Sequence, residues 1–452
     1  MDFYAPIARR VIAPLWAVKE GTPYLRHLKY LEMSQYLPLG KIREDQWMRL
    51  KKILKHSFEN TEFYKRRFLE NNATPEDIKD WGDFERVPFL TKEDIRGYRN
   101  EMVAKNIPKQ KLVAKKTSGS TGVSLEFFVD EDSLQWKRAC TVRHNRWTGW
   151  DLGERVAAIW GNPEHYKNWR MKLRNFLLDR YTYLDTLNMD EKSMIEFYRA
   201  ICYRLPALLF GHAHSLYLFS EFLKGKGWIP PRPRGIISTA MILHSHERKT
   251  IEEVFGIKVT NRYGCEEVSL IACECEKHQG LHTNLDTLVV ETIRDGKQTL
   301  PGEPGSIVVT DLTNYGMPFI RYKVGDVGIL SGENCSCGRS FPMFQSVEGR
   351  TADYIVTPEG KYISGISLTE NFAMLLPEIK QLQIVQDRKD HLILRIVKSN
   401  NYKKETEIKI QALFNQIFGI AMNYELEYLN MIPQEPSGKY RFCISKVSNQ
   451  FI

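Results

Sequence analysis

The chain has 452 residues, more than a single compact hydrophobic core usually spans, so we expect two or three domains or subdomains. Hydrophobic residues make up 42% of it and aromatic residues 12%, which excludes wholesale disorder. Its 64 lysines and arginines exceed its 55 aspartates and glutamates, and the net charge of +9 suits anionic ligands such as nucleotides, or an anionic membrane surface. Because no motif of stacked aromatic and basic residues accompanies this charge, we expect no nucleic-acid partner.

Residues 1–16, MDFYAPIARRVIAPLW, are apolar and basic but lack a long apolar run and a small-residue cleavage site, so they do not resemble a secretory signal. No stretch reaches the ~18 apolar residues that a membrane-spanning helix needs. The segment predicts a short helix packed on the protein body, and a helix lying on a membrane surface is the alternative. We therefore expect a cytoplasmic protein without a transmembrane segment, for which peripheral membrane contact stays open. The sequence does not indicate an oligomeric state.

Helical periodicity dominates residues 1–110. Apolar residues recur at three- and four-residue steps over residues 47–58, which is the spacing of one helix face. Thr91 precedes the helical segment KEDIR and Asp94 follows three residues later, the pattern of a capping box. Residues 111–130 then predict a strand, a Ser/Thr/Gly loop and a second strand.

Short apolar segments alternate with helical ones from residue 131 to residue 260, which predicts a layered α/β body. The expected strands are RVAAIWG, ALLFGHA, GIISTAM and KVTNRYG, and one expected helix is KTIEEVF. Beyond residue 350 the sequence predicts a hairpin, a helix at LTENFAMLL, two strands and a helix near residues 403–418. We therefore predict a large N-terminal α/β domain (residues 1–349) and a small C-terminal α+β domain (residues 350–452).

One loop is rich in hydroxyls and glycines and consists of Thr117, Ser118, Gly119, Ser120, Thr121 and Gly122. Glycines let successive backbone N–H groups turn toward one point, and hydroxyls add uncharged donors, so such a loop can hold phosphates. It is not a Walker A loop, because no GK[ST] follows. On the hexapeptide alone, a Ser/Gly turn without function remains the alternative.

An ordered series of motifs resembles the adenylate-forming (AMP-binding) superfamily, and within it the phenylacetate–coenzyme A ligase-like branch, which includes ligase-like proteins of capsular polysaccharide clusters. The motifs are HSFENTEFYKRRF with VPFLTKEDIR, TSGSTG, NRYGCEEVSLIACEC, FIRYKVGDVG, SVEGRTAD and PSGKYR. An ordered set over most of the chain is more specific than any single motif. The resemblance implies an AMP-binding domain followed by a mobile lysine-bearing domain, with the active site in the cleft between them.

The resemblance also implies roles for single residues. A carboxylate that attacks the α-phosphate of ATP brings anions together, so catalysis must position them and neutralise charge. Glu267 matches the family's acidic position and can hold a Mg²⁺ ion that bridges phosphate oxygens. Asp326 can accept hydrogen bonds from both ribose hydroxyls. Tyr263 and Gly264 are expected to line the adenine and acyl region.

The last two expected site residues follow later in the chain. Arg350 is expected near the ribose or phosphates at the domain junction, and Lys439 matches the lysine that reaches the α-phosphate and carboxylate oxygens. Two departures from the family pattern bear on the site. Glu266 stands where Ser or Thr usually precedes the acid, and Ala352 stands where the hinge acid is often found, with Asp353 next. These departures leave the hinge residue and the acyl acceptor open.

Two CxC pairs suggest a metal site, because paired cysteines in a cytosolic protein indicate metal before disulfide. Zinc takes four cysteine or histidine ligands in a tetrahedron. The set implied by the resemblance to metal-bound branch members is Cys275, His282, Cys335 and Cys337. Cys273 or His278 could replace one of these ligands. Four protein ligands leave no open position, so the zinc is expected to be structural. The isolated cysteines are expected as small buried side chains: Cys140, Cys202 and Cys443.

Three functions follow from these motifs. The favoured one is ATP-dependent activation of a small carboxylate with transfer to coenzyme A. The first alternative transfers the activated acyl or aminoacyl group to an amino sugar or carrier during surface-polysaccharide synthesis, and the second is an inactive nucleotide-binding scaffold. The acyl pocket is expected within residues 140–240, where Trp160 and His212 either face it or belong to the core.

Overall fold

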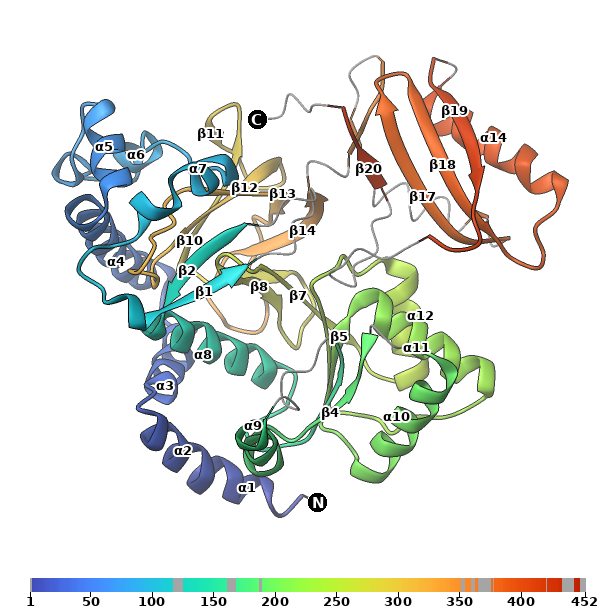
Figure 1. Cartoon of the computed structure of the whole chain (residues 1–452), viewed down its shortest axis with the longest axis horizontal. Helices are drawn as coiled ribbons and strands as arrows, with labels where there is room; N and C mark the ends of the chain where they lie inside the picture. Colours follow the sequence, from blue (N-terminus) through green and yellow to red (C-terminus); the bar gives the residue numbers. More distant parts are fainter. Residues whose placement is uncertain are drawn as a thin grey trace.

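The computed structural model describes residues 2–116, 125–160, 168–186, 189–350, 354–358, 362–364, 375–376, 378–419, 421–432 and 443–447. Helices and short turns build the first hundred residues (Figure 1), and their bounds are α1 Ala5–Ile7, η1 Ala8–Ile12, α2 Ala13–Glu20, α3 Tyr24–Ser34, α4 Leu39–Asn60, α5 Glu62–Glu70, η2 Pro75–Asp77, α6 Trp81–Glu85, α7 Lys92–Met102 and η3 Lys109–Lys111. The predicted capping box opens α7. The Thr91 N–H donates to Asp94 Oδ2 (2.8 Å), and the Asp94 N–H donates to Thr91 Oγ1 (3.1 Å).

A large mixed sheet forms the body, and its order is β11-β10-β12-β13-β14-β9-β8-β7-β6-β5-β3-β4. The strands of its parallel half are β3 Val156–Ile159, β4 Tyr181–Leu184, β5 Leu208–His212, β6 Gly235–Thr239 and β7 Val259–Cys265. The helices interleaved with them are α8 Glu131–Trp147, α9 Trp169–Arg174, η5 Asn175–Asp179, α10 Glu191–Arg204, α11 Ala213–Lys226 and α12 Ser245–Phe255. The four strands and the helix predicted here from the sequence are confirmed, because short apolar runs between helices are typical of parallel strands buried on both faces.

The other half of the sheet is antiparallel. Its strands are β8 Ser269–Glu274, β9 Leu281–Thr283, β10 Leu288–Arg294, β11 Lys297–Gln298, β12 Pro304–Asp311, β13 Tyr322–Leu330 and β14 Met343–Arg350. A separate antiparallel hairpin of β1 (Leu112–Lys116) and β2 (Glu126–Asp130) confirms the two strands predicted around the Ser/Thr/Gly loop. The large sheet therefore changes from parallel to antiparallel pairing at β7.

A four-stranded sheet of order β19-β18-β17-β20 and one helix form the C-terminal part, which lies to one side of the large sheet in Figure 1. Its elements are β17 Ile379–Arg388, β18 His391–Lys398, α14 Lys404–Phe418, β19 Asn423–Tyr428 and β20 Cys443–Ser445. The predicted hairpin is present as β15 (Tyr354–Val356) paired with β16 (Tyr362–Ser364). The helix predicted at LTENFAMLL falls almost entirely outside the described residues.

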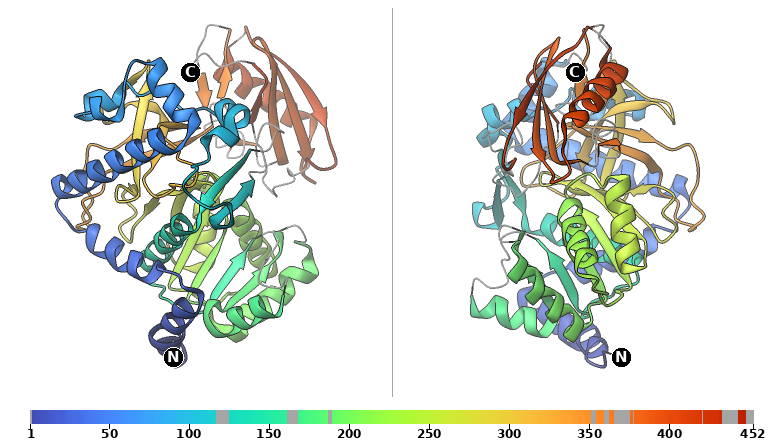
Figure 2. Two further views of the ribbon diagram at one scale, coloured as in Figure 1. Left: turned by 60° about the vertical axis from the view of Figure 1, so that its left-hand side comes forward. Right: turned by 90° about the vertical axis from the view of Figure 1, so that its right-hand side faces the viewer.

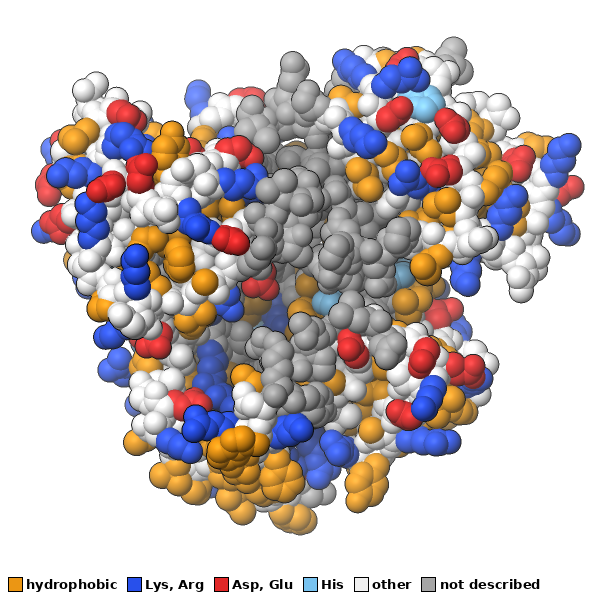
Figure 3. All heavy atoms as spheres, in the orientation of Figure 1, with side chains coloured by type: hydrophobic (Ala, Val, Ile, Leu, Met, Phe, Trp, Pro, Cys, Tyr) orange, Lys and Arg blue, Asp and Glu red, His pale blue; other side chains and the backbone are white. Residues whose placement is uncertain are grey.

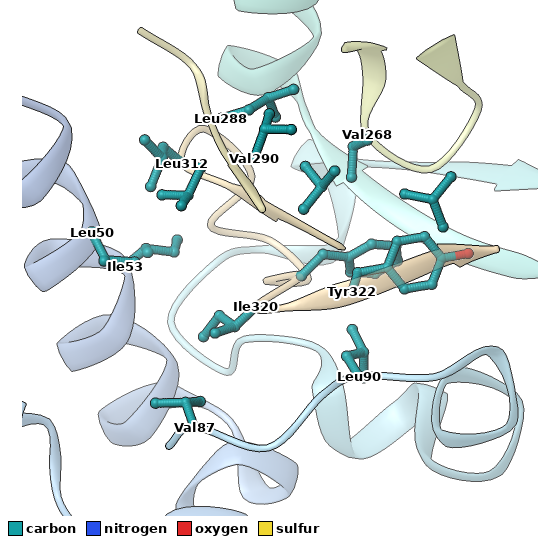
Figure 4. Close-up of a cluster of buried hydrophobic side chains, with 14 of the residues drawn as sticks. Leu50, Ile53, Val87, Leu90, Val268, Leu288, Val290, Leu312, Ile320 and Tyr322 are labelled. Atoms are coloured by element: carbon teal, nitrogen blue, oxygen red, sulfur yellow. The ribbon is translucent and has the colours of Figure 1, made fainter. Parts of the chain in front are cut away.

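Several hydrophobic clusters hold these parts, and two of them show how the two sheets are packed. The larger one packs α4 and α7 against the antiparallel half of the large sheet, and Figure 4 shows Tyr322 of this cluster between Leu90 and Val268. A second cluster joins α14 to the C-terminal sheet through residues such as Ile384, Leu394 and Phe414. The α/β architecture predicted from the sequence is confirmed, with a buried core for each of the two sheets.

The expected burial of the isolated cysteines is confirmed for two of them and wrong for the third. Cys140 and Cys443 are buried as predicted, but Cys202 is exposed, because it lies on the solvent side of α10, whose buried residues are Phe197 and Ile201. Among the described residues, no helix is both long and apolar enough to span a membrane.

Candidate active site and metal centre

The end of β7 carries the central acidic motif. Ligands of open α/β sheets bind beyond the carboxyl ends of the parallel strands, where the strand order or direction changes. β7 is the last parallel strand and turns back into β8 through residues 266–268, so Glu267 stands at such an edge. Gly264 is required there, because a Cβ atom at this position would lie 2.4 Å from the carbonyl oxygen of Ser269.

Two tyrosine–carboxylate hydrogen bonds join the β7–β8 hairpin to β13 in a reciprocal way. Tyr263 Oη on β7 donates to Asp326 Oδ2 on β13 at 2.6 Å. Tyr322 Oη on β13 donates to Glu267 Oε1 in the hairpin turn at 2.9 Å. Each segment thus gives one hydroxyl and one carboxylate, and the central and ribose motifs become one structural unit.

The strand pairing is irregular next to Tyr263 and next to Asp326. The β7–β8 register shifts between Tyr263 and Gly264, and the β13–β14 register shifts between Asp326 and Val327. Bulges of this kind re-aim side chains and are frequent next to active sites.

The two carboxylates are nearly buried, with exposures of 7% for Glu267 and 9% for Asp326. Burial and the neighbouring charge of Glu267 raise the pKa of Tyr322 well above its usual value, so its hydroxyl stays protonated and donates. Burial and the same carboxylate also raise the pKa of the Cys265 thiol. Among the described residues, the Glu267 side chain forms no ion pair with lysine or arginine, so its oxygens fit the hard-cation chemistry of Mg²⁺.

Lys137 on α8 is a site residue that the sequence analysis missed. Its Nζ lies 3.4 Å from the carbonyl oxygen of Glu267 and 3.4 Å from Asp311 Oδ2 at the end of β12. It therefore braces the backbone that carries the acid. A single lysine on a mostly polar helix gives no sequence signal, because the contact needs α8 to pack beside the β7–β8 turn.

The other predicted nucleotide-binding residues are only partly described. The loop from Thr117 to Gly122 and the residue Lys439 lie outside the described residues. Arg350 ends β14, where its backbone pairs with Asp326, and its side chain is not among the described ones. The structure thus brings together Tyr263, Gly264, Glu267 and Asp326.

The four predicted zinc ligands converge. The ligand atoms of Cys275, His282, Cys335 and Cys337 all lie within 4.8 Å of one another. Within the group, Cys275 Sγ is 3.6 Å from Cys335 Sγ, and Cys337 Sγ is 3.4 Å from His282 Nε2. The segment after β8, the strand β9 and the loop before β14 supply them, so one ion could tie these three segments together.

The surroundings of the four residues favour metal ligation. His282 Nδ1 lies 3.1 Å from the carbonyl oxygen of Phe341, which can only accept, so Nδ1 carries the proton and Nε2 faces the cysteines with a free lone pair. Burial lowers the pKa of His282 to about 4, which keeps the ring neutral. Although burial opposes it, hydrogen bonds from Arg339 lower the pKa of the Cys337 thiol. Backbone N–H groups of Lys277 and Arg339 point at Cys275 Sγ and Cys337 Sγ, both at 3.4 Å.

The two substitute ligands have other surroundings. His278 Nδ1 lies 3.2 Å from Glu274 Oε2, and Cys273 is fully buried outside the group of four. At the parallel half of the sheet, Trp160 and His212 follow β3 and end β5, and their rings pack with centroids 3.9 Å apart. His212 is buried, as expected of either a core or a pocket residue.

Comparisons with known proteins agree with these motifs. Residues 355–446 match the family model of the CapK C-terminal domain. The chain is 24% identical over 442 residues to protein CapK of Staphylococcus aureus, covering 94% of this chain and 93% of that protein. It is 26% identical over 396 residues to the phenylacetate–coenzyme A ligase of Thermus thermophilus, covering 81% and 82%. The structure of a 2-hydroxyisobutyryl-CoA ligase in the postadenylation state aligns over 91% of both chains with a TM-score of 0.74 at 19% identity.

Proposed function

We propose that this chain, which belongs to the phenylacetate–coenzyme A ligase-like branch of the adenylate-forming enzymes, activates a carboxylate with ATP. The observation that carries the proposal is the reciprocal pair of hydrogen bonds, Tyr263 to Asp326 and Tyr322 to Glu267, which unites the two nucleotide motifs in one buried polar site. In the first step, a carboxylate oxygen of the substrate attacks the α-phosphorus of ATP. The bond between the α-phosphorus and the oxygen that bridges it to the β-phosphate breaks, and acyl-adenylate and pyrophosphate form.

Each site residue has a part in this step. The loop from Thr117 to Gly122 would hold the phosphates, and Asp326 would accept hydrogen bonds from the ribose hydroxyls. Glu267 would hold Mg²⁺, which supplies charge neutralisation at the phosphates when bound. Tyr322 fixes the orientation of the Glu267 carboxylate, because its hydrogen bond occupies one of the two oxygens.

The C-terminal part would supply a positive charge, that of Lys439, at the reacting groups. We place a mobile domain at residues 350–452, and the family-model match over residues 355–446 supports a boundary near this point. Lys439 would reach the α-phosphate and carboxylate oxygens from this domain, and Arg350 would stand at the junction. In the second step, the thiolate of coenzyme A attacks the acyl carbon and AMP leaves, after the domain has carried Lys439 away.

A second acceptor is favoured by one specific observation. The matching family model and one relative both carry the CapK name. The alignment covers 93% of that CapK protein but 82% of the coenzyme A ligase relative. We therefore keep acyl or aminoacyl transfer to an amino sugar or carrier in surface-polysaccharide synthesis as the alternative. Both acceptors use the same first step in the same site, in a cytoplasmic enzyme.

A structural zinc ion completes the proposal. Cys275, His282, Cys335 and Cys337 would hold it in a closed site, eight residues after Glu267 at its nearest ligand. It would hold β8 and β9 against the loop before β14, and so stiffen the wall from which the β7–β8 turn projects.

The experiment that separates the acceptors measures AMP and product together. Purified protein is incubated with Mg·ATP and a panel of aryl, acyl, hydroxy and amino acids, with coenzyme A, with amino sugars, or with neither. We expect AMP release to depend on one acid, and mass spectrometry to find the acyl thioester. Acid-dependent AMP release with an amide or ester of the sugar, and no thioester, would establish the alternative. ATP binding without AMP release under any condition would instead support an inactive scaffold.

A further inference from the structure

The helical N-terminus shows its small side chains to the protein and its large apolar ones to solvent. Segments α1, η1 and α2 run without interruption from Ala5 to Glu20. The buried residues of this stretch are all alanines: Ala5, Ala8, Ala13 and Ala17. The contact is close, because a Cβ atom at Gly153 would lie only 2.5 Å from Ala8 Cβ. The alanines thus let the helix pack closely on the body, and Tyr4 and Arg9 add hydrogen bonds to the carbonyl oxygens of Leu177 and Leu152.

The outer face forms one apolar stripe. Its residues are 49% to 81% exposed and recur at steps of three or four: Phe3, Ile7, Val11, Leu15 and Val18. Core-facing helices normally bury such side chains, and here the pattern is inverted. The sequence predicted a helix packed on the protein body. The helix does pack there, but it does so with its small residues.

A second stripe continues the first. α9 and η5 expose Trp169, Leu173 and Phe176, again at helical spacing. The two segments lie side by side, because Tyr4 Oη donates to the Leu177 carbonyl (2.9 Å) and Arg174 pairs with Glu20 (3.0 Å). Figure 3 shows hydrophobic side chains gathered along the lower edge of the molecule, over α1, α2 and α9, with basic side chains beside them. Contiguous apolar surface of this kind marks an interaction site.

The charged residues of these two segments that form no ion pair with a described residue are all basic. Every acid of residues 2–20 and 168–180 is paired with an arginine: Asp2 with Arg180, and Glu20 and Asp179 with Arg174. The exposed cations of the same segments form no ion pair with any residue that the structure describes, and they are Arg10, Lys19, Arg170 and Lys172. A second copy of the chain would bring four cations against four cations, which disfavours self-association. An anionic surface would be complementary.

We propose that this face, formed by residues 2–20 and 168–180, docks on an anionic lipid bilayer surface. The apolar stripes would enter the boundary between headgroups and acyl chains, Trp169 would lie at the headgroup level, and the four cations would meet the lipid phosphates. The face lies at the end of the molecule that bears the N-terminus, and the C-terminal sheet lies at the opposite end in Figures 1 and 2, so docking would leave that part clear. The inference does not depend on the proposed reaction.

Vesicle co-sedimentation of the full chain tests the proposal. The vesicles are phosphatidylcholine alone or with about 30% phosphatidylglycerol, at low and high salt. We expect binding to the anionic vesicles, weakened by salt and at least about tenfold weaker to neutral ones. The apolar variant Leu15→Glu/Phe176→Glu should abolish binding, and the charge variant Arg10→Gln/Lys19→Gln/Arg170→Gln/Lys172→Gln should reduce it at least about tenfold.

Matched controls lie elsewhere on the molecule. Ile408→Glu changes a similarly exposed apolar residue of α14, and Lys52→Gln/Lys65→Gln/Lys389→Gln/Lys404→Gln removes four other exposed cations. Both controls should bind like the unaltered protein, and unchanged melting temperatures show that all variants fold. The proposal is overturned if the chain binds neither vesicle, or if the charge variant binds as well as its control. A dimer that Leu15→Glu/Phe176→Glu dissociates, without vesicle binding, would assign the face to a second copy instead.

Discussion

Tyr263 Oη lies 2.6 Å from Asp326 Oδ2, and this hydrogen bond spans 63 residues of sequence. Its counterpart runs the other way, from Tyr322 to Glu267. Both connect the β7–β8 hairpin to β13, on the antiparallel half of the sheet. The same two segments thus hold Glu267, proposed for the metal, and Asp326, proposed for the ribose. We therefore expect loss of one hydrogen bond to disturb the position of the other carboxylate as well.

The first prediction separates the two adjacent glutamates. Glu267→Gln keeps an oxygen that can accept from Tyr322 but removes the charge, so we expect pyrophosphate exchange to fall at least ~100-fold with little change in melting temperature. Glu266 is exposed and serves as the matched control, since Glu266→Gln should retain the exchange rate within about twofold. Equal losses in both variants would refute the assignment of Glu267.

A second prediction concerns the ribose. Hydrogen bonds to charged groups contribute about 1.5–3 kcal/mol, so Asp326→Asn should raise the KM for ATP roughly 10- to 100-fold. Tyr263→Phe leaves the carboxylate in place and should have a smaller effect. If Asp326 contacts the ribose, 2′-deoxyATP is a poorer substrate than ATP for the unaltered enzyme but nearly equal to ATP for Asp326→Asn. A full 2′-deoxy penalty in that variant would show that Asp326 does not bind this hydroxyl.

A third prediction addresses the C-terminal lysine. Lys439→Ala should lower pyrophosphate exchange at least ~100-fold, because it removes charge stabilisation at the α-phosphate. Conversion of presynthesised acyl-adenylate to the final product should be spared, since that step has no need of this lysine. Lys446, which is exposed and follows β20, is the control, and its alanine variant should behave normally in both assays. Retained exchange in Lys439→Ala would make the assignment of this lysine wrong.

The metal centre gives a fourth prediction. Metal analysis of the purified protein should find about one zinc per chain, as a closed four-ligand site holds one ion. Cys337→Ser should reduce this to less than about half an equivalent and lower the melting temperature by at least about 3 °C. Cys202→Ser and His278→Gln should keep the zinc, because one residue is exposed on α10 and the other contacts Glu274. A zinc content of about half an equivalent or less in the unaltered protein counts against the site.

The sequence carries much of the fold and part of the site. Apolar runs such as VAAI and GIIST predict β3 and β6 because strands buried on both faces have no polar alternation. The motif register selected Glu267 over Glu266, and the structure buries the first and exposes the second. The CxC spacing suggested a metal site, the family resemblance implied its four ligands, and the structure brings the ligand atoms of these residues within 4.8 Å of one another.

Contacts that depend on how distant segments pack could not be predicted. Tyr322 meets Glu267 only because the antiparallel half of the sheet brings β13 to the β7–β8 turn, and Lys137 reaches that turn from a helix. Cys202 was expected inside by its residue type, but its position on α10 places it outside. The sequence also did not reveal that the N-terminal helix packs with its small residues inward, since periodicity shows two faces of a helix without showing which one contacts the body.

The most direct test of the central claim is carboxylate-dependent exchange of labelled pyrophosphate into ATP, measured without coenzyme A or any other acceptor. Both proposed acceptors share this first half-reaction, so the result does not depend on which one is used. At least one acid of a broad panel should drive exchange well above the rate of the Glu267→Gln variant. Binding of ATP without exchange for any acid in the panel would contradict the assignment of this chain as an adenylate-forming ligase.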